Sequence, residues 1–354
     1  MKEVYRTAVV GAGAGGTLSM RALTASERYH LVAVADIDKE ARARATGAYP
    51  EIETYDDHRE MFSAQGPDVV CVATWPPAHR AITEAALELP LEGILVEKPL
   101  AGNWRDGRAI VEQVRERNLP LAVPHGLLVA DHGRQILGLV REGRIGELKL
   151  VEIECTGWDI INAGIHWLNY VLVLAGGEKV GCVMASCDTR TRTYRDHMQV
   201  ETVAVTYAQL RGGCRIVMHT GDEVLVSEQG KGTLFRLVGT KGTLEFYGWE
   251  PRYRLLSGTH PSGALVEVSP GPRSGHQRHL EHMALEMDCG VPDYAVAESS
   301  LAALEVVEAA YLSCRHRCQV MLPLSTFVPP EASDWEPGKP YSGKGGGRDG
   351  RKLS

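Results

Sequence analysis

The sequence predicts an α/β fold that begins with a doubly wound, parallel Rossmann sheet. Three observations predict it: a glycine-rich turn between an apolar strand and a helix, a carboxylate at the end of the next strand, and further strands that alternate with helices. The chain has 354 residues, 44% of them hydrophobic, which is enough for two domains with a core in each. We therefore expect a soluble globular protein of two domains.

Charge and composition narrow the classes of partner. The formal net charge is −7, from 38 Lys and Arg against 45 Asp and Glu, with no basic block, so small molecules are expected as partners rather than nucleic acid or a membrane. The N-terminal residues show no apolar signal segment, and no later apolar run is long enough to cross a bilayer, which predicts a cytoplasmic protein.

The eight cysteines, including Cys314 and Cys318 one helical turn apart, are expected to be reduced and mostly buried.

A phosphate-binding turn is predicted at residues 11–16, directly after the apolar strand 7–10. Gly11 permits the tight turn, Gly13 lets the backbone approach a pyrophosphate, and Gly16 lets the following helix pack closely on the strand. The start of that helix offers unpaired N–H groups to the anion. The alternative is a glycine turn in an ordinary α/β unit without a ligand. The turn residues expected to bind the cofactor are Gly11, Ala12, Gly13, Ala14 and Gly16.

Asp36 ends the next strand, 31–35, and lies 20 residues after Gly16. A carboxylate at this point accepts hydrogen bonds from both ribose hydroxyls and repels a 2′-phosphate. The next two residues add no positive charge, and Lys39 is the one nearby cation. The sequence therefore predicts NAD(H) rather than NADP(H).

Two further strands end in residues that we expect to lie near the cofactor, because parallel sheets bind ligands beyond the carboxyl ends of their strands. Strand 67–74 leads into Trp75 and His79, and strand 93–97 leads into Lys98 and a proline. Packing at the start of its helix is an equal alternative for His79. The residues assigned here to cofactor binding are Thr74, Trp75, His79, Glu97 and Lys98.

Lys98 is also a candidate catalytic residue. It follows an apolar strand directly and precedes a proline that fixes the turn, where the nicotinamide is expected. The positive ring of oxidised nicotinamide would partly destabilise its ammonium, so that it could share a proton with a substrate hydroxyl. The alternative is an ordinary surface lysine after a strand.

These elements together resemble the Gfo/Idh/MocA family of oxidoreductases, the glucose–fructose oxidoreductase and inositol dehydrogenase group. The resemblance rests on Gly11-x-Gly13-x-x-Gly16, Asp36, the segment 74–79 and Glu97-Lys98-Pro99-Leu100-Ala101, and it continues in 142–147, 239–245 and 305–323. It implies a second, C-terminal α/β domain with a large, open, mostly antiparallel sheet. One face of that sheet carries the active site, and the other commonly forms an oligomer interface, so a homodimer or homotetramer is expected.

The second half of the chain agrees with this expectation when it is considered alone, because β-rich runs punctuated by glycines fill it. We expect an NAD-binding domain at 1–123, a substrate-binding and oligomerisation domain at 124–328, and a Pro/Gly-rich tail at 329–354. Composition favours disorder in the tail, and an arm that docks on a neighbouring subunit through Trp335 and Tyr341 is the alternative. The β-rich runs are 148–154, 180–187, 201–207, 214–220, 233–238 and 243–247.

The resemblance also points to a helix with the pattern Asp-x-Gly-x-His-x-x-Asp. Residues 162–169 match its histidine but carry asparagine at both acidic positions. Without the family, Asn162, His166 and Asn169 still form a polar stripe on an apolar helix, which either faces a substrate or satisfies a buried histidine. His166 is the candidate base that takes a proton from a secondary hydroxyl, with Lys98 hydrogen-bonded to the same oxygen.

The asparagine at 162 leaves two possibilities open. In the first, His166 is the base and works either with a lowered pKa or with another carboxylate such as Asp159. In the second, the chemistry differs from simple dehydrogenation.

His125 follows strand 121–123, where relatives often place an arginine. Packing is no less plausible for His125 than lining a pocket. The residues assigned to substrate binding are Asn162, Asn169, His125, Trp158 and Asp159.

No metal is expected. His276, His279 and His282 are spaced by three residues, which turns the third side chain of a helix well away from the first, and no cysteine or carboxylate pair completes a site.

The first hypothesis for function is an NAD-dependent dehydrogenase or reductase that acts on a secondary hydroxyl of a sugar, sugar derivative or cyclitol, with Lys98 and His166 handling the proton. A glycoside-cleaving or eliminating enzyme that oxidises the sugar transiently and recycles its NAD is the alternative. A non-catalytic sensor of NAD or sugar is a third hypothesis, but a pure binder needs neither Lys98 nor His166.

Overall fold

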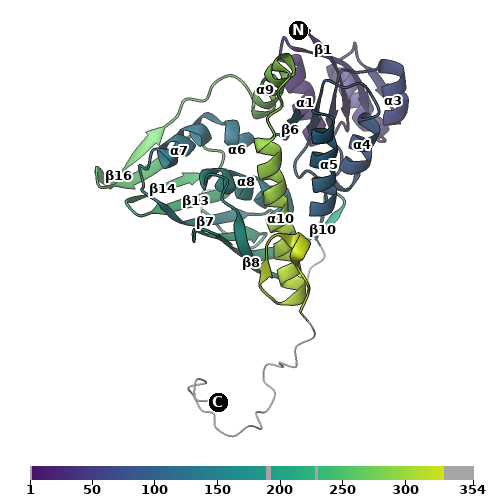
Figure 1. Ribbon diagram of the computed structural model, residues 1–354. Coiled ribbons are helices and arrows are strands. Elements are labelled where there is room, and N and C mark those ends of the chain that lie inside the picture. Colours follow the sequence, from purple (N-terminus) through teal and green to yellow (C-terminus); the bar gives the residue numbers. More distant parts are fainter. Residues whose placement is uncertain (1, 189–192, 228–229, 331–354) are drawn as a thin grey trace.

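The computed structural model describes residues 2–188, 193–227 and 230–330, which form two β-sheets with helices packed against them (Figure 1). From residue 331 onward, the predicted tail with Trp335 and Tyr341 lies outside the described residues. Among the helices within these ranges, none has both the length and the hydrophobicity needed to cross a membrane. The predicted fold class, a parallel Rossmann sheet followed by a mostly antiparallel sheet, is confirmed.

The first sheet has six parallel strands in the order β3-β2-β1-β4-β5-β6. Its central strands are almost completely buried because helices cover both of its faces. The strand order reverses between β1 and β4, and ligands bind beyond the carboxyl ends of strands at such a switch point. The strands are β1 Tyr5–Val10, β2 Tyr29–Ala35, β3 Glu53–Tyr55, β4 Val69–Val72, β5 Gly93–Val96 and β6 Leu121–Ala122, and the helices are α1 Ala14–Thr24, α2 Lys39–Ala48, α3 His58–Gln65, η1 Pro76–Ala78, α4 His79–Ala86 and α5 Trp104–Glu116.

The second sheet has nine strands in the order β16-β15-β14-β13-β7-β12-β11-β8-β17. Every neighbouring pair is antiparallel except β7 and β12, which run parallel. A separate hairpin, β9 Thr193–Arg195 with β10 Met198–Val200, follows β8. The strands are β7 Leu148–Thr156, β8 Val180–Asp188, β11 Val203–Leu210, β12 Arg215–Gly221, β13 Thr233–Gly239, β14 Gly242–Tyr247, β15 Arg252–Ser257, β16 His260–Glu267 and β17 Val320–Met321.

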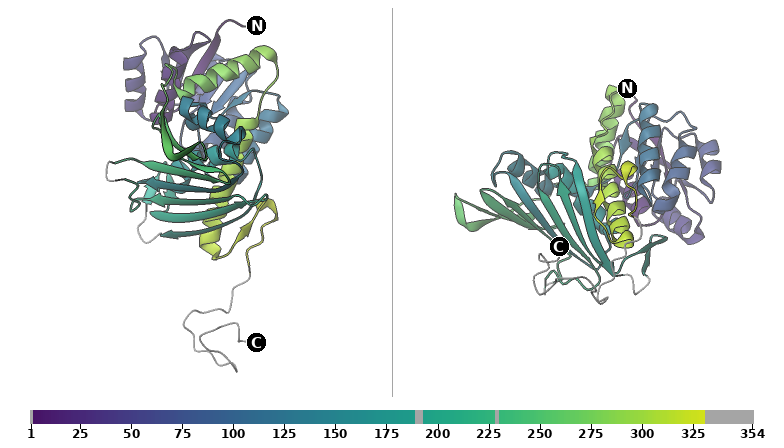
Figure 2. Two further views of the ribbon diagram at one scale, coloured as in Figure 1. Left: turned by 90° about the vertical axis from the view of Figure 1, so that its left-hand side faces the viewer. Right: turned by 60° about the horizontal axis from the view of Figure 1, so that its bottom comes forward.

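Helices gather on one side of this second sheet (Figure 2). The two faces of the sheet differ in solvent exposure, as strand β12 shows. Ile216 and Met218 are buried on one face, while the alternate residues Val217 and His219 are partly exposed on the other. We call the face that carries Val217 and His219 the open face. The helices of this half are α6 Gly126–Val129, α7 Asp131–Arg141, η2 Ile160–Gly164, α8 Ile165–Leu174, α10 Ala295–His316 and η3 Leu324–Thr326.

Helix α9, Gly275–Cys289, returns from the second sheet to the first and lies beside α1 (Figure 1). Leu280 is fully buried in the apolar cluster beneath the first sheet, together with Val9 and Leu95. The Tyr29 hydroxyl donates a hydrogen bond to the Leu280 carbonyl. The two halves of the chain are therefore joined by a shared core and not only by a linker.

We predict that Leu280→Ala lowers the stability of the protein by about 2–5 kcal/mol, because it leaves a cavity between α9 and the first sheet. Leu285→Ala is the matched control, since Leu285 lies on the same helix but is 58% exposed. The melting temperature measures both. Equal melting temperatures for the two variants would show that α9 does not stabilise the first sheet in this way.

Candidate active site

The glycine turn between β1 and α1 needs glycine at two positions for steric reasons. Gly11 has φ of +98°, and a Cβ there would lie 2.3 Å from the carbonyl oxygen of Ala73. A Cβ on Gly16 would lie 1.8 Å from the carbonyl oxygen of Gly11. A Cβ on Gly13, in contrast, would meet no atom of the described residues within 4 Å. Gly13 therefore borders free space, as a backbone that a ligand approaches must.

The start of α1 is suited to bind a phosphate. Ala14 is its first residue, Gly13 precedes it as the cap, and within the described chain neither a capping side chain nor an acidic residue occupies this first turn. The N–H groups here carry the positive end of the helix dipole and are available to an anion. The residues present therefore fit the pyrophosphate of a dinucleotide.

Asp36 connects the end of β2 to the glycine turn. Its carboxylate accepts hydrogen bonds from the N–H of Ala12 at 2.6 Å and from that of Asp38 at 2.8 Å. The Asp36 carbonyl accepts a hydrogen bond from Arg42 at 2.6 Å. Sequence reasoning considered Lys39 as the local cation and missed Arg42, which lies one turn further along α2. The Asp36 carboxylate is thus fixed beside the glycine turn at the end of β2.

The loop after β4 carries three residues that were assigned to the cofactor, and the structure separates them. His79 is fully buried, with its ring nitrogens 3.2 Å from the Leu100 carbonyl and 2.9 Å from the Thr74 carbonyl, so it packs between two loops. The Thr74 hydroxyl is buried and has no hydrogen-bond partner among the described residues. Trp75 is 44% exposed and stacks on His197 of the β9–β10 hairpin, with ring centroids 4.5 Å apart.

Glu97 lies beneath the glycine turn, where a Cβ on Gly15 would come within 3.1 Å of its Cγ. Burial would raise the pKa of this carboxyl group, but the hydrogen bond from His276 and the adjacent positive charges outweigh burial and lower it. His276 Nε2 lies 2.6 Å from Glu97 Oε1. Glu97 thus supports the turn and binds α9.

Lys98 connects the first sheet to the segment that precedes α8. Its Nζ donates a hydrogen bond to the Asn162 carbonyl at 3.2 Å. Burial lowers the pKa of this ammonium group, and the negative charges of Glu97, Asp196 and Asp159 oppose that shift only in part. Lys98 is therefore a buried amine that joins the end of β5 to the segment before α8.

The segment around Asn162 departs from the uniform helix that the polar stripe suggested. Residues Ile160–Gly164 form a π-helical turn, η2, and α8 begins only at Ile165. Asp159 caps this turn, accepting from the Asn162 N–H at 2.7 Å and from Asn162 Nδ2 at 3.0 Å. Extra-wide turns of this kind occur frequently at functional sites.

The Asp159 carboxylate binds Arg195 as well, at 3.0 Å, and no contact joins it to His166 among the described residues. Arg195 also pairs with Asp222 at 2.8 Å and lies over the half-exposed ring of Trp158, 5.4 Å from its centroid. Sequence reasoning placed Asp159 and Trp158 in the site but missed Arg195, which lies in the distant β9–β10 hairpin.

His166 lies between two aromatic neighbours, His125 and Trp249, at centroid distances of 5.5 and 5.6 Å. Its Nδ1 has no hydrogen-bond partner in the part of the chain that the structure describes. Burial, followed by the charge of Lys98, lowers its pKa well below the ordinary value, so the ring is neutral at physiological pH. The half-exposed Trp249 was missed, because nothing in its local sequence connects it to residue 166.

Two residues assigned to the substrate are buried by packing. His125 is 1% exposed, and its Nε2 lies 2.8 Å from the Ser300 hydroxyl. Asn169 is fully buried, and its Nδ2 donates to the Ser299 hydroxyl at 2.8 Å. Both contacts are made to α10, so Asn169 joins α8 to α10, whereas His125 also contacts the ring of His166.

The three histidines of α9 make three separate contacts. His276 binds Glu97, His279 Nε2 lies 3.2 Å from the His125 carbonyl, and His282 pairs with Glu286 on the same helix. Within the described residues, no group of three or more His, Cys, Asp or Glu side chains is arranged to hold a metal ion.

The chain matches two family models. Residues 5–125 match an oxidoreductase family model described as an NAD-binding Rossmann fold, and residues 138–322 match the C-terminal alpha/beta domain of the oxidoreductase family. The site geometry agrees with the first of these, since the glycine turn, the free start of α1 and Asp36 form a cradle for a dinucleotide.

Curated and solved relatives extend along most of the chain. It is 31% identical over 342 residues to a D-apiose dehydrogenase of Paraburkholderia graminis, with 88% of either chain covered. It is 25% identical over 324 residues to the rhizopine catabolism protein MocA of Rhizobium meliloti, covering 86% of this chain and 94% of the relative.

An inositol dehydrogenase homolog from Azotobacter vinelandii, solved with NADH and myo-inositol, has the same fold, with a TM-score of 0.76 at 19% identity over 91% of this chain and 98% of that one. The matched models together span most of the sequence, from residue 5 to residue 322, and the protein therefore belongs to the Gfo/Idh/MocA family of NAD-binding oxidoreductases.

Proposed function

We propose that the protein transfers a hydride between the nicotinamide of NAD and a secondary hydroxyl or ketone of a sugar, sugar derivative or cyclitol. The observation that supports this most is the hydrogen bond from Lys98 Nζ to the Asn162 carbonyl. This hydrogen bond holds Lys98, at the end of β5, against the segment that leads into His166. The proposed hydrogen-bond donor, Lys98, and the proposed base, the neutral imidazole of His166, therefore belong to one site.

Bound NAD⁺ supplies the hydride acceptor. His166 takes the hydroxyl proton of the substrate on a ring nitrogen. Lys98 donates a hydrogen bond to the same substrate oxygen and stabilises its negative charge as the proton leaves. Asn162 positions Lys98 through its carbonyl, and Asp159 positions Asn162.

The names of the relatives support a polyol substrate. The D-apiose dehydrogenase and the inositol dehydrogenase homolog are both named for polyhydroxylated compounds that carry secondary hydroxyls. The half-exposed Trp158 and Trp249 offer apolar faces on which a sugar ring can stack. The glycoside-cleaving and sensor alternatives find no support among these relatives.

The test is NADH formation by the purified protein with NAD⁺ and a panel of aldoses, cyclitols and glycosides. Parallel reactions with NADP⁺ test the selectivity assigned to Asp36, and NAD⁺ should be preferred. Tight NAD⁺ binding without NADH from any member of the panel would contradict the proposal for these substrate classes.

We predict that Lys98→Ala and His166→Ala each lower kcat by about 10²–10⁴-fold, because each removes a group that handles the substrate proton. Lys241→Ala and His30→Ala are matched controls, since both residues are exposed and lie outside the site. Circular dichroism and NAD⁺ affinity check that the variants are folded. A folded His166→Ala protein with the wild-type kcat would remove His166 from the mechanism.

The lowered pKa of His166 predicts the pH dependence of alcohol oxidation. The base must be neutral, and a pKa below the ordinary 6.5 keeps it neutral at more acidic pH. The acid limb of kcat/KM should therefore lie well below pH 6.5 and should be absent in the residual activity of His166→Gln. An acid limb at or above pH 6.5 that depends on His166 would be incompatible with a desolvated imidazole.

We also propose that the chain forms a homodimer or homotetramer through the open face. Apolar residues on adjacent strands of this face remain exposed, among them Met184 at 43% and Val205 at 45%. Contiguous apolar surface of this kind favours a partner. Sedimentation velocity should give a mass of two or four chains, and a charged substitution such as Val205→Glu should dissociate the assembly. A monomer at micromolar concentration would exclude this proposal.

A further inference from the structure

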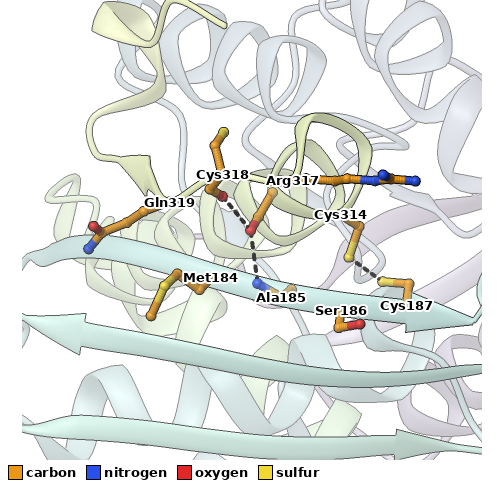
Figure 3. A pocket seen from close by; sticks show the side chains of 9 residues that line it. Met184, Ala185, Ser186, Cys187, Cys314, Arg317, Cys318 and Gln319 are labelled. Carbon is orange, nitrogen blue, oxygen red and sulfur yellow. Dashed lines mark hydrogen bonds between the residues drawn. The ribbon is translucent and has the colours of Figure 1, made fainter. Parts of the chain in front are cut away.

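Two thiols lie in contact at the edge of the second sheet, far from the cofactor cradle in the sequence. Cys187 on β8 and Cys314 on α10 have their sulfur atoms 2.6 Å apart (Figure 3). They are 127 residues apart in the chain, so the fold alone brings them together. The expectation that the cysteines are reduced thiols that simply pack does not describe this pair fully.

The two elements that carry these cysteines are also joined by hydrogen bonds next to the pair. The Ser313 hydroxyl accepts a hydrogen bond from the Ala185 N–H at 2.9 Å and donates one to the Cys318 carbonyl at 2.7 Å (Figure 3). Beyond the end of α10, β17 pairs with β8, with Val320 opposite Val183. The sulfur atoms are thus held together by backbone elements and not by chance orientations of free side chains.

Solvent reaches the pair. Cys187 and Cys314 are both partly exposed, whereas Cys71, Cys155 and Cys214 are buried. An open surface pocket of about 640 Å³ adjoins both sulfurs. It is lined by Met184, Ala185, Ser186, Cys187, Ser313, Cys314, Arg317, Cys318 and Gln319.

We propose that Cys187 and Cys314 form a reversible redox site that a small hydroperoxide oxidises to a disulfide between β8 and α10. A third thiol, Cys318, lies in the same pocket, but the direct sulfur contact selects Cys187 as the partner of Cys314.

The chemistry uses the hydrogen bond between the two sulfurs. The contact between the sulfurs lowers the pKa of Cys314, and in the proposed sequence Cys314 attacks first as its thiolate. Its sulfur bonds to one peroxide oxygen, the O–O bond breaks, and the other oxygen leaves as water with one thiol proton. The Cys187 sulfur then attacks the resulting sulfenic acid, the S–O bond breaks, and the second water leaves. Two thiols and one hydrogen peroxide become one disulfide and two waters.

The Cys187–Cys314 pair lies close to a hydrogen-bonded contact that supports η2, the turn before α8. Tyr311, one turn before Cys314 on α10, donates a hydrogen bond to Glu201 at 2.7 Å. The other oxygen of the buried Glu201 accepts from the N–H of Ile160, the first residue of η2, at 2.6 Å. A disulfide at Cys314 would fix the turn of α10 that holds this contact.

The experiment treats the folded, full-length wild-type protein with hydrogen peroxide and digests it without reduction for peptide mapping by mass spectrometry. We expect a peptide that links Cys187 to Cys314, the loss of the free thiol at both positions in the peptide map, its recovery with dithiothreitol, and a higher melting temperature of the oxidised protein.

Three variants complete the test. Cys187→Ser and Cys314→Ser should abolish the linked peptide and the rise in melting temperature, and Cys318→Ser, in the same pocket, should retain both. The exposed Cys289 serves as an internal measure of oxidation in every sample. Wild-type protein with oxidised Cys289 but free Cys187 and Cys314, or a disulfide from Cys314 to Cys318 instead, would overturn the proposal. Because the decisive map is made on the wild type, a variant that fails to fold does not affect the result.

Discussion

The buried carboxylate of Asp159 organises the centre of this molecule. A charge without solvent is stable only when hydrogen bonds and an opposite charge replace the lost water. Asp159 is fully buried, and the backbone and side-chain N–H groups of Asn162 together with the guanidinium of Arg195 meet that requirement. The same contacts set the π-helical turn, fix the carbonyl that Lys98 binds, and attach the β9–β10 hairpin to the site.

This arrangement also explains how asparagine fits at position 162. An aspartate there would place a second carboxylate against Asp159, and two such charges at contact distance repel each other. The amide instead donates to Asp159. As a consequence, His166 has no carboxylate partner among the described residues, and its imidazole remains neutral. Within the first of the two possibilities that the sequence left open, a working His166, the geometry favours a histidine with a lowered pKa over one paired with Asp159.

The cofactor half and the substrate half are connected at several points along the site. Glu97 joins the glycine turn to α9 through its contact with His276. Lys98 joins β5 to η2 through the Asn162 carbonyl, and Trp75 contacts the β9–β10 hairpin through His197. Each contact places a residue of the first sheet against one from the second half of the chain. The position of Lys98 relative to His166 therefore depends on the packing of the two halves, which the buried Leu280 of α9 stabilises.

The Rossmann sheet and the glycine turn could be predicted from the amino-acid sequence, because both depend on local spacing, and the same spacing pointed to Asp36 and Lys98. His166 was singled out by the family resemblance and by the polar stripe of its helix. A glycine with positive φ or a carboxylate at a strand end is constrained by its immediate neighbours in the chain. The β-rich runs of the second half also predicted six of its strands. The strands β9, β10, β15 and β16 were not predicted, and β9 and β10 have only three residues each.

The contacts between residues far apart in the chain could be read only from the folded structure. The pairs Asp159 with Arg195, Glu97 with His276, and Cys187 with Cys314 join distant parts of the chain, and local periodicity carries no information on such partners. Burial likewise separated residues that looked equivalent in the sequence: His79 and Asn169 are enclosed by packing, whereas Trp75 and Trp158 remain half exposed. The physical reason is that strand order and helix docking, which fix solvent access and charge pairing, are properties of the whole fold.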